Sequence, residues 1–367
     1  MSPSKTYSGH SEEAHPEIYT EVAMPEQPTV KKPGQLSEDK IRQFFEKGWV
    51  LVEDFFTPEE LEPVRKATER LVDIVAQRLY KAGKISSLHE DLGLFQRLTV
   101  LEKESPGASV LVHKLGFLPP EYKALLSHER LVNVLEQVLG PRVAASPVWN
   151  IRTKTPNCIN GEIPWHQDSG YFAPDSYKTL IPVAWVPLLD ATPENGCLQY
   201  LEGGHRRGVV CDHLNCWEDT WHVMLDESKI EETLGVSKER DLRTVPVKYG
   251  GFLLFNNLIP HRSLENKSND VRWSLDLRWQ RPGEPEGLFG IQQPVLLRDP
   301  DKPDLQVDWA PFEDSRHVKQ AEYLTEKDRE KDELDSTISG PWMKQWRIVH
   351  GNKHTKAAGL EEEGPER

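Results

Sequence analysis

The pattern of apolar and polar positions divides the chain into a helical first part and a strand-rich second part. A helix is expected over 37–47, where Ser37 can cap the first turn. A second helix is expected to begin at Thr57, which is followed by a proline and then by Glu60 at the third helical position. A third amphipathic pattern covers 129–139 and ends before a Gly-Pro pair. Helices therefore precede the strands.

From about residue 143 the pattern changes to short β-rich runs separated by turns. Strands are predicted at 49–56, 148–152, 181–189, 252–255 and 271–279. Runs of this length and spacing are typical of a sandwich or a closed barrel. A charged helix is expected around 322–334, and a stretch near 205–245 is interpreted as an insertion between two strands. The pattern predicts a mainly β protein with flanking helices.

Charge and composition narrow the classes of function. The 367 residues include 45 Lys and Arg against 59 Asp and Glu, a net charge of −14, so we expect no nucleic-acid partner. No apolar run has the length of a membrane span, and the start of the chain lacks a secretory signal. Four cysteines are too few for a disulfide scaffold. We expect a cytoplasmic monomer or homodimer without membrane contact, acting on a small molecule.

Two residues in the strand-rich part can bind a metal. His166 and Asp168 lie in the run Trp165-His166-Gln167-Asp168, and residues two apart on a strand project to the same face. An imidazole nitrogen and a carboxylate oxygen are two of the three ligands of the facial triad of non-haem iron(II). Such pairs also arise by chance, so the pair alone is weak evidence. Gln167 points to the opposite face and is expected to be structural.

A downstream segment supplies the missing ligand. His261 follows the buried run at 252–255, and Arg272 lies eleven residues later in the next predicted strand. An arginine that faces the interior is costly unless an anion pairs with it. The dicarboxylate 2-oxoglutarate can supply this anion, since its keto acid end chelates iron while its far carboxylate accepts a guanidinium fork. Iron(II) and 2-oxoglutarate are therefore the candidate cofactor and co-substrate.

Four motifs together resemble the phytanoyl-CoA dioxygenase family of iron(II)/2-oxoglutarate oxygenases. They are Trp165-His166-Gln167-Asp168, the run 184–192, the run 193–205 that ends in Gly203-Gly204-His205, and the segment from His261 to Arg272. The resemblance spans about residues 40–285. It implies a double-stranded β-helix (jelly roll, cupin-like) core within one domain at 37–350. Residues 1–36 contain five prolines and almost no periodic apolar pattern, so they are interpreted as a disordered leader, and residues 351–367 as a disordered tail.

The resemblance also implies an activity and a set of site residues. The enzyme would hydroxylate a carboxylic acid, an amino acid or an acyl thioester with dioxygen, giving succinate and carbon dioxide as co-products, with ascorbate as a candidate stimulant. His166, Asp168 and His261 would be the catalytic metal ligands, and Arg272 would bind the far carboxylate of 2-oxoglutarate. The residues that would complete the co-substrate pocket are Trp185, Ser263 and Lys114.

Two departures from the family pattern concern the rim of this pocket. Arg262 follows the distal histidine where the family commonly has glycine, and Gly204 stands where the family commonly has serine. Neither departure removes a ligand. Asp168 retains the carboxylate that related halogenases replace with a small residue, so halogenation is not expected.

Other interpretations remain open from the sequence. The chain could be a catalytically silent jelly roll that binds a partner, or a cupin-type metalloenzyme that does not use 2-oxoglutarate. Cys211, His213 and Cys216 with His222 could suggest a zinc cluster, but chance thiols in an insertion explain this irregular group better. We interpret His205 as a hydrogen-bonded loop histidine. Two interpretations stay open for Trp217, Trp221, Trp273 and Trp279, a hydrophobic substrate mouth or core and lid packing, and for Trp273 and Trp279 core packing is at least as good an explanation.

Overall fold

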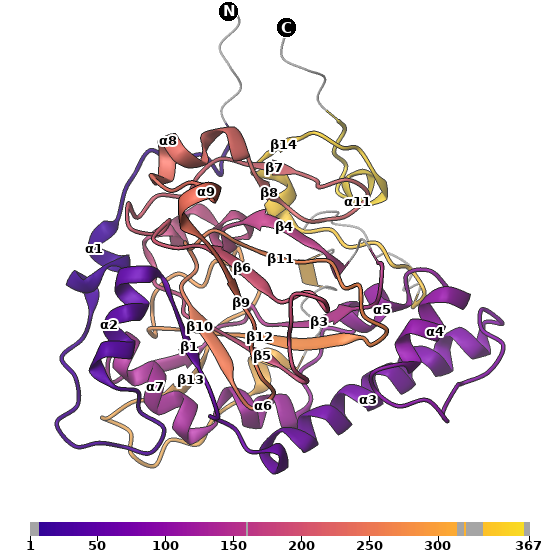
Figure 1. The fold of residues 1–367 in the computed structure, drawn as a ribbon, viewed down its shortest axis with the longest axis horizontal. Helices are drawn as coiled ribbons and strands as arrows, with labels where there is room; N and C mark the ends of the chain where they lie inside the picture. The colour runs from indigo at the N-terminus through magenta and orange to yellow at the C-terminus, as the bar shows by residue number, and fades with distance from the viewer. Residues whose placement is uncertain (1–6, 159–160, 314–318, 321–332, 363–367) are drawn as a thin grey trace, which may run out of the picture.

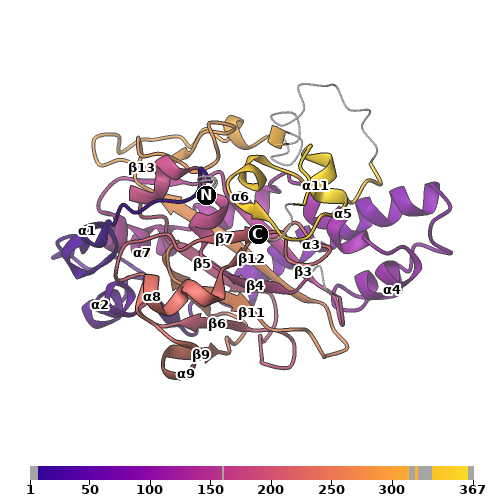
Figure 2. The same ribbon diagram turned by 90° about the horizontal axis from the view of Figure 1, so that it is seen from above.

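The computed structural model describes residues 7–158, 161–313, 319–320 and 333–362 (Figure 1). Its centre consists of two antiparallel sheets that face each other, and the two views show helices along the outer side of the larger sheet (Figures 1 and 2). Side chains from both sheets meet between them, among them Trp185 and Phe255 from the larger sheet and Tyr200 from the smaller one. This is the arrangement of a jelly roll with flanking helices, and it confirms the predicted fold class.

The order of the strands in the two sheets determines where the candidate site lies. The larger sheet has the order β1-β10-β5-β12-β2-β13, with β3 also paired to β12. Its strands are β1 (Trp49–Val52), β2 (Val143–Ala145), β3 (Asn150–Lys154), β5 (Val183–Pro187), β10 (Phe252–Phe255), β12 (Arg272–Gln280) and β13 (Val295–Arg298). The smaller sheet has the order β4-β11-β6-β9. Its strands are β4 (Ile163–His166), β6 (Leu198–Leu201), β9 (Leu242–Val245) and β11 (His261–Ser263).

Strand β12 divides its side chains between a helix-facing side and an interior side. Trp273, Leu275, Leu277 and Trp279 belong to the main apolar core, which includes the inner faces of the long helices. Both indole N–H groups donate to backbone carbonyls, Trp273 to Leu94 at 2.9 Å and Trp279 to Leu126 at 3.1 Å. The alternate residues, from Arg272 to Gln280, are polar and equally buried. A period of two therefore directs charged groups into the jelly roll.

The predicted long helices are confirmed. They are α2 (Glu38–Lys47), α3 (Pro58–Lys81) and α7 (Glu129–Leu139). Ser37 accepts a hydrogen bond from the backbone N–H of Lys40, and Thr57 and Glu60 form a reciprocal capping box. Helix α2 ends at Gly48, whose positive φ of 87° suits glycine.

Three helices between α3 and α7 were not predicted. They are α4 (Arg97–Glu104), α5 (Ala108–Lys114) and α6 (Pro120–Leu126). Each is eight residues or shorter, and none has a side-chain cap at its N-terminus. Residues 108–113 of α5 are all buried, so the segment lacks the polar face that gives a helix its periodic signal. Several predicted strands also shift: the run 49–56 ends at Val52, and the run 148–152 becomes β3.

Residues 7–36 differ from the disordered leader that the sequence predicts. Helix α1 (Pro16–Tyr19) carries Tyr19 into the core, where its hydroxyl lies 2.6 Å from the carbonyl of Tyr177 and 2.8 Å from that of Thr179. The backbone N–H of His15 donates to the carbonyl of Gly208 at 2.9 Å. These contacts join residues that are far apart in the sequence, so they leave no periodic pattern of apolar residues within the segment itself. The segment therefore lies against the body of the protein.

The C-terminal part of the chain forms a third sheet with two strands of the insertion. In the third sheet, β14 (Arg347–Ile348) pairs in parallel with β7 (His213–Asn215), which pairs with β8 (Met224–Leu225). The insertion also contains α8 (Ile230–Leu234) and α9 (Lys238–Asp241). Helix α11 (Lys353–Ala357) orders part of the predicted disordered tail through a capping box at Asn352. Most of the predicted helix at 322–334 lies outside the described residues. Within them, no helix combines the length and the apolar character needed to cross a membrane.

Candidate metal centre

The three candidate ligands meet at one edge of the smaller sheet. His261 in β11 is directly opposite His166 in β4, and their ring centroids are 4.1 Å apart. Gln167 keeps an extended backbone, so Asp168, at the start of the short helix η3 (Asp168–Tyr171), projects to the same side as His166. Oδ1 of Asp168 lies 3.6 Å from Nε2 of His166 and 3.8 Å from Nε2 of His261. All three side chains are buried.

Both imidazoles are oriented by backbone carbonyls. Nδ1 of His166 lies 2.8 Å from the carbonyl of Pro164, and Nδ1 of His261 lies 3.0 Å from that of Ile259. Because a carbonyl only accepts, each Nδ1 carries a proton, and Nε2 is the ring nitrogen that faces Asp168 and is available to a metal. Burial, together with the neighbouring His166, lowers the pKa of His261 to about 3. His261 is therefore neutral at pH 7, as a metal ligand must be.

Arg278 holds the carboxylate ligand. Its Nε and Nη2 donate to Oδ2 of Asp168 at 3.0 and 2.7 Å, which leaves Oδ1 towards the two histidines. Burial by itself would raise the pKa of Asp168, but the Arg278 guanidinium and the two imidazoles keep this pKa far below its usual range. Asp168 is therefore ionised with one oxygen free for a metal. A partner that orients a ligand in this way is common around protein metal sites.

The donor set fits iron(II). One ligand atom from each of His166, Asp168 and His261 can be chosen so that all lie within 4.8 Å of one another, and this is the one such group among the residues that the structure describes. Two imidazoles and one carboxylate on one side of a centre, with the other side open to a cavity, form the facial arrangement of non-haem iron(II) sites. The zinc hypothesis for Cys211, His213 and Cys216 finds no such geometry within the described chain.

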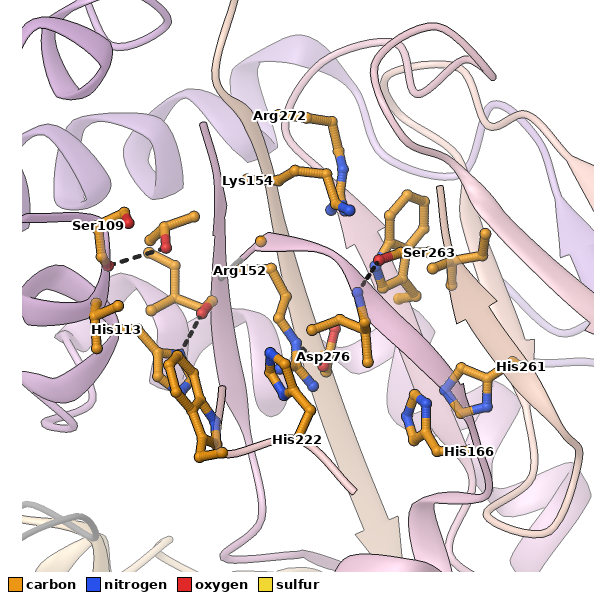
Figure 3. Close-up of a pocket in the computed structure, with 18 of the residues that line it drawn as sticks. Ser109, His113, Arg152, Lys154, His166, His222, His261, Ser263, Arg272 and Asp276 are labelled. Carbon is orange, nitrogen blue, oxygen red and sulfur yellow. Dashed lines mark hydrogen bonds and ion pairs between the residues drawn. The ribbon is translucent and has the colours of Figure 1, made fainter. Parts of the chain in front are cut away.

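A cavity extends from this centre to Arg272 (Figure 3). His166 and His261 line one end, and Arg272, Ser263 and Trp185 line the other. The Arg272 guanidinium lies over the Trp185 ring at 5.1 Å and donates to Oγ of Ser274 at 2.5 Å. Its buried Nε has no hydrogen-bond partner in the described part of the chain. Burial lowers the pKa of Arg272 to about 10, so this residue is a buried cation at pH 7.

Lys114 does not line this cavity. Its Nζ donates to the backbone carbonyl of Asp335 at 2.6 Å and to the Asp335 carboxylate at 3.2 Å. A different lysine stands beside Arg272: Lys154 in β3 is the cross-strand partner of Arg272 in β12, and it lines the cavity. Burial and the adjacent Arg272 lower the pKa of Lys154 well below its ordinary value. Its Nζ donates to the carbonyl of Leu264.

Sequence reasoning missed three residues of the site. They are Arg278, Lys154 and Asp276, which forms an ion pair with Arg152. The signal for Arg278 was present, because it lies six residues after Arg272 on the same strand and so on the same face. The signal for Lys154 required the pairing of β3 with β12, which local sequence does not specify.

The remaining candidates have structural roles. His205 is buried, and its Nε2 lies 2.9 Å from the carbonyl of Phe45. Gln167 is also buried and bonds three backbone groups on the other side of the strand. Arg262 donates from Nε to Gln199 at 2.8 Å and lies over the Trp165 ring. A Cβ at Gly204 would lie 2.5 Å from Pro260, which explains why serine does not stand there.

Comparisons with known proteins give a consistent result. A family model described as phytanoyl-CoA dioxygenase (PhyH) matches residues 44–274. A phytanoyl-CoA dioxygenase from Arabidopsis thaliana is 24% identical over 290 residues, covering 70% of this chain and 98% of its own. Phytanoyl-CoA dioxygenase domain-containing protein 1 is 25% identical in Mus musculus and 22% identical in Danio rerio, in both cases over 267 residues, 65% of this chain and 87% of theirs.

Solved structures with a similar course of the chain were also found. The non-haem monooxygenase ThoJ, in its apo form, covers 71% of this chain and 84% of its own, with 16% identity and a TM-score of 0.49. EctD from S. alaskensis, also in its apo form, covers 73% of this chain and 84% of its own, with 19% identity and a TM-score of 0.48.

Proposed function

This chain belongs to the phytanoyl-CoA dioxygenase family, and from that premise we propose that it is an iron(II)- and 2-oxoglutarate-dependent dioxygenase that hydroxylates a small organic molecule. One dioxygen, one 2-oxoglutarate and one C–H bond of the substrate are converted to carbon dioxide, succinate and an alcohol. The substrate is a carboxylic acid, an amino acid or an acyl thioester. The enzyme acts in the cytoplasm as a monomer or homodimer, with a single domain to which residues 7–36 and helix α11 also belong.

One observation carries the proposal: two histidines of a buried ligand triad line the same cavity as a buried arginine that has no carboxylate partner among the described residues. Neither feature is needed for folding, since an unpaired buried guanidinium is costly. A dicarboxylate explains both at once, because one end can reach the metal and the other the arginine. When bound, iron(II) supplies the activation of dioxygen for which no amino-acid side chain is suited.

The side chains of the cavity would hold the co-substrate. Arg272 would bind its far carboxylate through a fork whose direction is set by Ser274 and by the ring of Trp185. Ser263 accepts a hydrogen bond from the N–H of Ile163 at 3.1 Å, so its hydroxyl hydrogen remains available for that carboxylate. Lys154 would add a second positive group in place of the expected Lys114. Arg278 would keep Oδ1 of Asp168 directed at the metal.

The test is a titration of the anaerobic protein with iron(II) and 2-oxoglutarate, monitored by the weak visible charge-transfer band of the chelate. The wild type should give the band, and His166→Ala should abolish it. A wild type without the band would support a catalytically silent binding module. If Arg272→Ala leaves turnover and the 2-oxoglutarate requirement intact, the cupin-type alternative without this co-substrate is correct.

A further inference from the structure

We propose that the substrate is a free carboxylic acid without an amino group, whose carboxylate binds Arg152 and whose apolar body lies among Tyr171, Trp221 and Trp342. This inference rests on the proposed function, because it concerns the compartment beside the same candidate iron site. Of the three proposed substrate classes, it selects the carboxylic acid over the amino acid and the acyl thioester.

The interior face of β3 and β12 carries more positive than negative charge. Lys154, Arg152, Arg272 and Arg278 face Asp276 and Asp168, so four cations stand against two carboxylates among the described residues that line the site. Each carboxylate already has a guanidinium partner, Asp276 through Arg152 and Asp168 through Arg278. Iron(II) and a 2-oxoglutarate dianion would cancel each other's charge. A surplus of two positive charges then remains, or of one if burial neutralises Lys154.

Arg152 is the cation whose donors remain available to a substrate. Its Nε donates to Oδ2 of Asp276 at 2.7 Å, and no other hydrogen bond within the described chain engages this guanidinium. The side chain is 22% exposed and lines both cavities that adjoin the triad. Figure 3 shows its guanidinium between Asp276 and His222, on the side of the cavity that leads to His166. Asp276 therefore anchors one edge of the fork and leaves the terminal nitrogens for a bidentate carboxylate.

The position of Arg152 separates it from the co-substrate site. Lys154 is paired with Arg272 and Arg152 with Ser274, so Arg152 lies one interior-facing step along the ladder. Two residues of a strand span roughly 7 Å. Two carboxylates can therefore be held at the two positions without overlapping, one near Arg272 and one near Arg152.

Aromatic rings form the rest of the compartment. Tyr171 is the last residue of η3, the short helix that begins with the candidate ligand Asp168. Trp221 comes from the insertion, and Trp342 comes from the C-terminal part in η7 (Pro341–Lys344). The rings of Tyr171 and Trp342 have centroids 6.1 Å apart. These residues line one cavity together with Asp168 and Arg278. The aromatic walls of this cavity suit an apolar or aromatic body.

The same chemistry disfavours the other two classes. The ammonium of an amino acid would need a carboxylate, and both carboxylates that line the described part of the site are bound to guanidinium groups. A coenzyme A thioester has no acidic group next to its acyl chain, and its phosphates lie at the far end of a long arm. Neither the amino acid nor the thioester would therefore match Arg152, a cation placed so close to the candidate metal.

The experiment uses four molecules with the same phenylpropanoyl body: 3-phenylpropanoate, its primary amide, phenylalanine and the coenzyme A thioester, with octanoate as an alkyl acid. Their binding to the full-length protein is measured by titration calorimetry, both without metal and in the anaerobic iron(II)–2-oxoglutarate complex. The two free acids should bind. The amide, the amino acid and the thioester should bind at least about tenfold more weakly, because each lacks the charge or adds an unmatched group.

Variants of Arg152 identify the group that recognises the acid. Arg152→Gln should weaken acid binding at least about tenfold and leave the affinity for 2-oxoglutarate within a factor of two. Arg152→Lys should be intermediate, because it keeps the charge and loses the fork. Arg142→Gln, a surface arginine paired with Asp299, serves as the matched control and should bind as the wild type does.

Three outcomes would overturn the inference: none of the acids binds, the amide or thioester binds as well as the acid, or Arg152→Gln raises the requirement for 2-oxoglutarate instead of weakening acid binding. Failure of the proposed function is separately visible, because the charge-transfer band would then be missing even where acids bind the metal-free protein. An unchanged circular dichroism spectrum and melting temperature establish that each variant is folded.

Discussion

Arg278 donates two hydrogen bonds to a single oxygen of Asp168, from Nε at 3.0 Å and from Nη2 at 2.7 Å. The other carboxylate oxygen faces Nε2 of both His166 and His261. The arginine thus decides which lone pairs of the carboxylate remain for a metal. It also compensates a charge that burial would otherwise make costly.

Replacing this arginine should weaken metal binding. We expect Arg278→Gln to lower the affinity for iron(II) by about ten- to a hundredfold, since partners that orient ligands typically contribute this much. Arg278→Lys keeps the charge without the fork and should fall in between. Titration calorimetry under argon measures the affinity, with Arg142→Gln as the surface control. An affinity for Arg278→Gln within twofold of the wild type would contradict the role assigned to this contact.

Lys154 and Arg272 are like charges placed directly opposite each other on β3 and β12. Such a pair destabilises a sheet unless an anion lies between them. Lys154→Met should therefore raise the unfolding free energy of the protein without ligands and weaken 2-oxoglutarate binding by about tenfold. Urea unfolding and a 2-oxoglutarate titration measure the two effects. Lys302→Met on the surface is the control, and a Lys154→Met variant with unchanged co-substrate affinity would show that Arg272 acts without it.

His205 makes stability depend on pH. Burial lowers its pKa to about 4, whereas the same group in the unfolded chain titrates near 6.5. As the pH falls below 6.5, the unfolded chain takes up a proton that the folded chain refuses until about pH 4, so stability is lost across this range. From pH 7 to pH 5 this one histidine should cost about 2 kcal/mol. Urea unfolding of His205→Gln should show a fall that is smaller by this amount; equal slopes for variant and wild type would contradict the assignment.

Trp346 connects the C-terminal part to η3, the short helix that begins with Asp168. Its indole N–H donates to the carbonyl of Gly170 at 2.7 Å. Trp346→Phe should cost about 1–3 kcal/mol of unfolding free energy, because it leaves a buried carbonyl without its donor. Trp342→Phe is a matched control, since the indole nitrogen of Trp342 has no partner within the described chain. The prediction fails if both variants lose the same stability in urea.

The fold and the ligand triad were accessible to sequence reasoning to different degrees. Helices with an apolar face and a cap, such as α2 and α3, begin where the sequence predicts because both signals are local. The helices α4 to α6 were missed because a short or fully buried helix has no amphipathic period. His166 and Asp168 were identified as a pair from their spacing. Lys114 was assigned to the pocket by resemblance alone, and the structure directs it to Asp335.

The sequence by itself determined the alternation along β12, and with it the separation of an apolar face for the helices from a polar face for the site. It also determined the three ligand types and their order. Tertiary structure alone decided which cation stands beside Arg272, which guanidinium holds Asp168, and which guanidinium faces the aromatic compartment. The physical reason is that a strand's period is a property of its own residues, whereas cross-strand pairing depends on register between segments more than a hundred residues apart.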